Sequence, residues 1–130
     1  MGCDIHGWIE RKVGNKWVAV SELTERGRFR NYRRFAALAG VRGDGPAAVG
    51  VPSDVSDTAK YWIEYYGADG HSHSCMSLSR ALDVFFSTDM GQTDSMLGSD
   101  RFFFDYFGLD VYGGENDPIG DFRLVFWFDN

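Results

Sequence analysis

All three histidines and both cysteines of this chain lie in two short segments, Cys3–Gly7 and Asp69–Cys75. Each segment holds two ligand-type side chains spaced two residues apart. Neutral imidazole binds Zn, Mn, Fe and Ni, and a carboxylate adds the negative charge that holds a cation. We therefore expect one divalent cation at Asp4, His6, His71 and His73, with Asp69 behind them as the acceptor that orients a histidine. A water bound to such a cation would supply a hydroxide nucleophile.

A purely structural interpretation of the same residues stays open. In that interpretation residues 71–74 form a polar loop before a helix, and His6 is hydrogen-bonded inside a sheet. The cysteines are not expected to be ligands, because the chain lacks the Cys-x2–4-Cys pair typical of structural zinc sites. Nothing in the sequence marks either thiol as an activated nucleophile.

Charge is spread unevenly along the chain, whose net charge is −6. Residues 26–42 carry six of the 13 basic residues, and Arg28, Arg30, Arg33 and Arg34 form a candidate binding site for phosphate or an acidic partner; the alternative is a solvated surface. Residues 83–130 carry ten acidic residues against two arginines, a net charge of −8, so this half could bind a basic host protein. We do not expect nucleic acid as a direct ligand, because phosphate binding needs cationic neutralisation.

Alternating side chains predict a strand over residues 4–12, with Ile5, Gly7 and Ile9 on one face. Asp4 and His6 then share the other face. Gly14-Asn15 is typical of a hairpin turn, and residues 17–20 follow as the return strand. If residues 69–75 are also extended, His71 and His73 share a face as well.

The remaining elements follow from capping residues and apolar spacing. Asn31 and Gly40 bound a predicted helix over 32–39, Ser56 and Gly67 bound one over 57–66, and Ser77 caps a third. Residues 40–53, rich in glycine and proline, are expected to be a loop. Residues 122–128 are almost wholly apolar, as in a buried strand. We predict an α+β fold, one domain over residues 1–130, with a small mainly antiparallel sheet packed with three or four short helices.

No run of apolar residues is long enough to cross a membrane, and unpaired cysteines favour a reducing compartment. Four stretches, Met1–His6, 30–32 with 35–42, 67–74 and 123–130, together resemble a family of small bacteriophage and prophage proteins of uncharacterised function. That resemblance implies a phage source and expression in the host bacterial cytoplasm. Locally, Asp4–Gly7 and Gly70–His73 are also similar to the first and last metal motifs of calcineurin-like metallophosphoesterases, whose middle Asn-His-Glu motif is absent here.

Three functional hypotheses follow. The first is metal-dependent hydrolysis of a phosphoester or nucleotide at the histidine segments. The second is a non-enzymatic, acidic inhibitor of a host defence system, such as an anti-CRISPR or other counter-defence protein, acting through acidic residues including those at 94, 100, 105 and 110. The third is an accessory protein whose histidine cluster only stabilises the fold.

Overall fold

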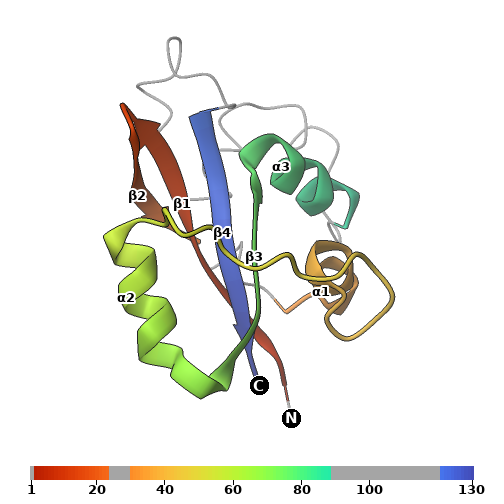
Figure 1. Cartoon of the computed structure of the whole chain (residues 1–130). Coiled ribbons are helices and arrows are strands. Elements are labelled where there is room, and N and C mark those ends of the chain that lie inside the picture. Colours follow the sequence, from red (N-terminus) through yellow and green to blue (C-terminus); the bar gives the residue numbers. More distant parts are fainter. Residues whose placement is uncertain (1, 24–29, 89–120) are drawn as a thin grey trace.

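The computed structural model describes residues 2–23, 30–88 and 121–130, and its centre is a four-stranded antiparallel sheet in the order β2-β1-β4-β3 (Figure 1). Helices lie on both faces of the sheet, α1 and α3 on one and α2 on the other. The elements are β1 Asp4–Val13, β2 Lys16–Glu22, α1 Tyr32–Ala39, α2 Asp57–Tyr66, the 3-10 turn η1 Gly67–Asp69, β3 Gly70–Ser77, α3 Leu78–Ser87 and β4 Phe122–Asp129. The predicted α+β class is confirmed.

The predicted hairpin forms from β1 and β2, which pair antiparallel from Val13↔Lys16 outward. Gly14 adopts φ +63° in the turn, a backbone conformation that a residue without a Cβ reaches at low cost. Strand β1 also pairs along its length with β4. Two segments from opposite ends of the chain therefore form the centre of the sheet.

One face of the sheet is the hydrophobic core, covered by α1 and α3 (Figure 1). We call it the paired-helix face. Ile5, Ile9, Leu124, Phe126 and Phe128 are all fully buried. Burying each such side chain contributes about 1.5–3 kcal/mol. This face is what holds β1 and β4 in a fixed register.

The opposite face, which we call the α2 face, is more polar. Its centre is Glu10, which is fully buried and accepts hydrogen bonds from Arg123 Nε and from the backbone N–H of Ser56, both at 2.7 Å. Ser56 in turn caps α2 through a hydrogen bond from Ala59 N. A buried carboxylate thus ties β1 and β4 to the start of α2, and so fixes where that helix lies.

Helices α1 and α2 begin and end where the capping residues predict, and α3 begins directly after Ser77 as predicted. Asn31 accepts a hydrogen bond from Arg34 N, Ser56 caps α2, and Gly40 and Gly67 both have positive φ at the helix ends. Strand β3 is the main difference from the sequence-based expectation, since the polar segment 70–77 pairs with β4 as an edge strand. The free edge of β3 is hydrogen-bonded to the predicted loop over residues 40–53. Gly50 N donates to His73 O at 2.8 Å, and Val49 N donates to Ser74 Oγ at 3.2 Å. Among the described residues no helix is long and apolar enough to span a membrane.

Candidate functional site

A row of three aromatic side chains crosses the α2 face, one from each of three neighbouring strands. His6 of β1 lies beside Trp127 of β4, and His73 of β3 lies on the other side of the indole. Both imidazoles stack on Trp127 with ring centroids 6.3 Å away, at interplanar angles of 30° and 23°. The fully buried indole therefore separates the two histidines.

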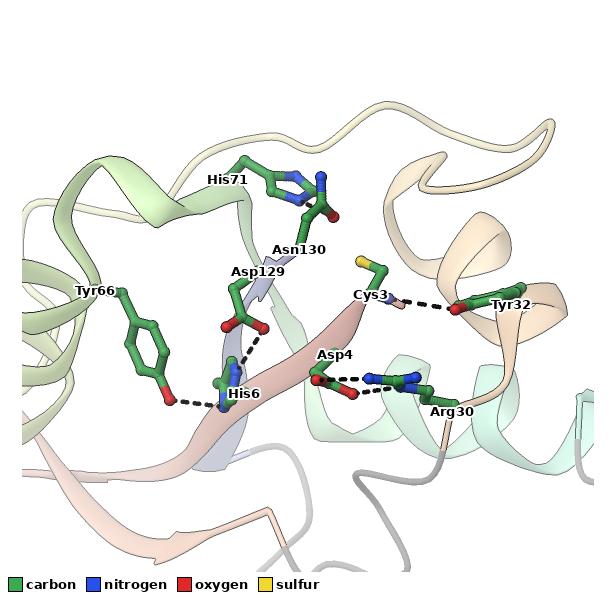
Figure 2. Close-up of polar contacts among 9 residues, drawn as sticks. All are labelled: Cys3, Asp4, His6, Arg30, Tyr32, Tyr66, His71, Asp129 and Asn130. Atoms are coloured by element: carbon green, nitrogen blue, oxygen red, sulfur yellow. Dashed lines mark hydrogen bonds and ion pairs between the residues drawn. The ribbon is translucent and has the colours of Figure 1, made fainter. Parts of the chain in front are cut away.

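His6 is the centre of a hydrogen-bonded chain (Figure 2). Its Nε2 lies 3.0 Å from Asp129 Oδ1, at the end of β4, and its Nδ1 lies 3.1 Å from the hydroxyl of Tyr66, the last residue of α2. The Tyr66 ring also lies against the imidazole, with centroids 4.4 Å apart. The side chains of His6 and Asp129 are 19% and 28% exposed, so the chain of contacts is only partly screened by water.

The partners of His6 fit one tautomer of its neutral ring. An ionised carboxylate only accepts hydrogen bonds, so Nε2 carries a hydrogen and donates it to Asp129. In the neutral ring Nδ1 is then an acceptor, and Tyr66 O–H donates to it. The arrangement is a hydroxyl, an imidazole and a carboxylate in series, the order found when an imidazole activates a hydroxyl and a carboxylate orients the imidazole.

His71 lies on the other face, and the expectation that it shares a face with His73 is wrong. His71 is in register with Phe128 and stacks on that ring at 6.2 Å, whereas His73 stacks on Trp127. Adjacent residues of β4 point to opposite faces. The cause is an irregularity between His71 and Ser74, where Ser72 adopts φ +54° and one extra residue enters the strand. His71 Nε2 instead lies 3.1 Å from Asn130 Oδ1.

His73 is held in an apolar environment. Burial lowers the pKa of His73, and the neighbouring His71 lowers it further. Its Nε2 is buried and has no hydrogen-bond partner among the described residues, and the same holds for the indole nitrogen of Trp127. The β-carbon of Tyr66 lies close by, since a Cβ added at Gly70 would contact both that atom and His73 Nε2 at 3.4 Å. The Tyr66 ring also lies edge-on to Trp127, with ring centroids 5.9 Å apart.

Asp4 does share a face with His6, as its spacing predicts, but its partner is Arg30. The Arg30 guanidinium donates from Nε at 2.7 Å and from Nη2 at 3.1 Å (Figure 2). These hydrogen bonds hold the pKa of the Asp4 carboxyl below its usual value. Asp69 is exposed on η1 and hydrogen-bonds to none of the three histidines, all of which lie in the described part of the chain.

The four arginines of the predicted phosphate site have different surroundings. Arg28 lies outside the described residues, and Arg33 is exposed on α1. Arg34 is buried, donates to Thr88 Oγ1 and to Phe85 O, and lies over the Phe85 ring at 4.2 Å. Arg34 therefore packs α1 against α3 rather than facing a ligand. The predicted acidic surface over residues 83–130 lies largely outside the described residues.

Neither thiol is activated in the described structure. Burial raises the pKa of Cys75 to about 11 and also raises the pKa of Cys3 above its ordinary value. A thiol in that state is protonated near neutral pH and is a poor ligand and nucleophile. This agrees with leaving both cysteines out of the predicted site.

The structure does not bring Asp4, His6, His71 and His73 to one point. His71 lies on the paired-helix side, and Trp127 stands between His6 and His73. Across residues 2–23, 30–88 and 121–130, no group of three or more His, Cys, Asp or Glu side chains is placed to hold a metal ion. Binding of a divalent cation to this protein stays a prediction.

Sequence reasoning missed Tyr66 and Asp129, the two partners of His6. Each carried a weak signal: Tyr66 ends a capped helix just before the second histidine segment, and Asp129 follows a buried strand directly. Neither signal names a partner, because 60 and 123 residues separate them from His6.

Comparison with known protein families, curated proteins and solved structures finds no match to this chain. The resemblance to phage proteins therefore stays a prediction from the sequence.

Proposed function

We propose that this protein is a hydrolytic enzyme in which the Tyr66 hydroxyl is the reacting group, His6 the base and Asp129 the carboxylate that orients the base. The single observation that supports it is the continuous chain of hydrogen bonds from Tyr66 to His6 to Asp129, at 3.1 Å and 3.0 Å. A phenol hydroxyl becomes a good nucleophile when a neighbouring imidazole takes its proton, and a carboxylate stabilises the imidazolium that results.

The reaction is displacement at an ester in two balanced steps. His6 Nδ1 takes the proton of Tyr66, Tyr66 Oη forms a bond to the ester phosphorus, and the bond to the leaving oxygen breaks as that oxygen receives the proton from His6. A water molecule then gives its proton to His6 and attacks the phosphorus. The bond to Tyr66 breaks, and Tyr66 Oη recovers a proton from His6.

Phosphoesters and nucleotides are the first substrate class to test, because the similarity of the two histidine segments to metallophosphoesterase motifs indicates them. A metal-assisted form belongs to the same proposal, but in it a divalent cation would have to displace Arg30 from Asp4 and one of the two hydrogen-bond partners of His6. Chelation separates the two forms. Phage origin and location in the host bacterial cytoplasm remain parts of the proposal based on sequence resemblance alone.

The test is hydrolysis of p-nitrophenyl phosphate and bis(p-nitrophenyl) phosphate by the full chain, with EDTA and with added Zn or Mn. We expect Tyr66→Phe to reduce turnover in EDTA to the background rate, because the variant lacks the oxygen that attacks the substrate. Tyr32→Phe is the matched control, because the Tyr32 hydroxyl accepts a hydrogen bond from Cys3 N beside α1 instead of contacting His6. Turnover that is equal in wild type and Tyr66→Phe, or no turnover of either substrate, would overturn the proposal.

A further inference from the structure

Helix α2 turns large aromatic side chains toward solvent. Ala59 is its one fully buried residue, whereas Tyr61 and Tyr65 are 60% and 68% exposed. Trp62 lies between them, with ring centroids 5.2 Å from each tyrosine. We call Tyr61, Trp62 and Tyr65 the aromatic patch of α2. Exposed patches of this composition are typical of interaction surfaces, where tyrosine and tryptophan are enriched.

The charges around the aromatic patch indicate the charge of the partner that it binds. Asp57, Glu64 and Asp69 are all exposed, and Lys60 is the only base in residues 57–69, which leaves a net charge of −2. A second copy of the chain would place −2 against −2, so self-association through this surface is disfavoured. Cations are attracted twice, by the carboxylates and by the electron-rich faces of the rings.

The fold already uses this attraction elsewhere. The Arg123 guanidinium lies 4.0 Å from the centroid of Trp17, and Arg42 lies over Tyr32 at 5.3 Å. In the described part of the chain, no arginine or lysine is placed in this way over the patch. Within the described residues, the rings of the patch are thus open to a cation that comes from another molecule.

We propose that the aromatic patch of α2 binds an arginine- or lysine-rich segment of a partner protein. The guanidinium or ammonium groups lie on the rings of Tyr61 and Tyr65, and neighbouring basic residues pair with Glu64 and Asp69. The two tyrosines are one helical turn apart, about 6 Å along the axis at 1.5 Å per residue. That spacing suits successive side chains on one side of an extended basic segment, which lie about 6.5 Å apart.

The test is fluorescence polarisation with a labelled octa-arginine peptide and the full chain, at about 0.15 M salt to limit long-range attraction. We expect the double variant Tyr61→Ala/Tyr65→Ala to weaken binding at least about fivefold. The matched control is Val13→Ala/Val18→Ala, which removes exposed apolar side chains from the hairpin and should leave Kd unchanged. A labelled octa-glutamate peptide should not bind.

A second variant tests the same proposal in case removal of two rings destabilises α2. Glu64→Lys retains the patch and reverses one charge, and it should also weaken octa-arginine binding while circular dichroism shows an intact fold. Equal Kd values for wild type and the double tyrosine variant would overturn the proposal, because binding would then depend on net charge alone. Binding that survives Tyr66→Phe shows that the patch acts independently of the proposed catalytic chain.

Discussion

Removal of the Glu10 carboxylate should cost more stability than any surface substitution, for a reason that the structure makes explicit. Glu10 is fully buried, and its two oxygens accept from Arg123 Nε and Ser56 N at 2.7 Å each. Arg123 is itself buried, and its other contacts in the described part of the chain are with the exposed Asp54, at 3.1 Å, and with the Trp17 ring at 4.0 Å. Glu10→Ala therefore leaves a buried cation short of its main partner and a buried amide without an acceptor.

The size of the loss follows from these contacts. Breaking a buried ion pair by removing one partner costs about 3–5 kcal/mol. For a chain of 130 residues, unfolding entropy of about 2.1 cal/mol/K per residue converts that loss to a fall in Tm of roughly 11–18 °C. The assay is thermal and urea unfolding at pH 7, followed by circular dichroism.

Glu64→Ala is the matched control, since Glu64 is exposed on α2 and such changes stay within about 0.5 kcal/mol. A loss below about 1 kcal/mol for Glu10→Ala would refute the reasoning, because loss of the buried partner of Arg123 and of the acceptor for Ser56 N should cost more than that. The double variant Glu10→Leu/Arg123→Met should be more stable than Glu10→Ala. Such a recovery would assign the loss to the buried charge of Arg123 without its Glu10 partner.

Two further predictions concern the candidate site residues. Burial lowers the pKa of His73 below its ordinary value of 6.5, so the unfolded chain takes up this proton at a higher pH than the folded chain does. The contribution of His73 to the free energy of unfolding should therefore be full above pH 6.5 and decrease as the pH falls below it. In urea unfolding between about pH 7.5 and 5, His73→Gln should make the stability depend less steeply on pH. An unchanged slope would contradict the assignment. Arg30→Gln should raise the titration midpoint of the Asp4 carboxyl toward 3.8 in an NMR titration, because its hydrogen bonds to Arg30 hold that pKa down; a midpoint that does not move would show that another group is responsible.

Local signals predict much of this fold. A helix end depends on residues within a few positions of it, so Asn31, Ser56, Gly40 and Gly67 were enough to place the ends of α1 and α2. The hairpin follows from its turn and its alternating side chains, and β4 from its apolar run. Strand β3 was missed because its residues are mostly polar and small. It forms because β4 offers an unpaired edge, which is a property of the assembled sheet.

The sequence by itself determined which residues can do chemistry, and it correctly placed Asp4 and His6 on one side of a strand, because side chains alternate along any extended chain. Only the tertiary structure decided their partners. The antiparallel register of β1 with β4 brings Asp129 to His6, the packing of α2 brings Tyr66, and the extra residue at Ser72 sends His71 to the opposite face from His73. Register and bulge position are set by the whole core, since a shift of one residue would turn every buried side chain of a strand toward water.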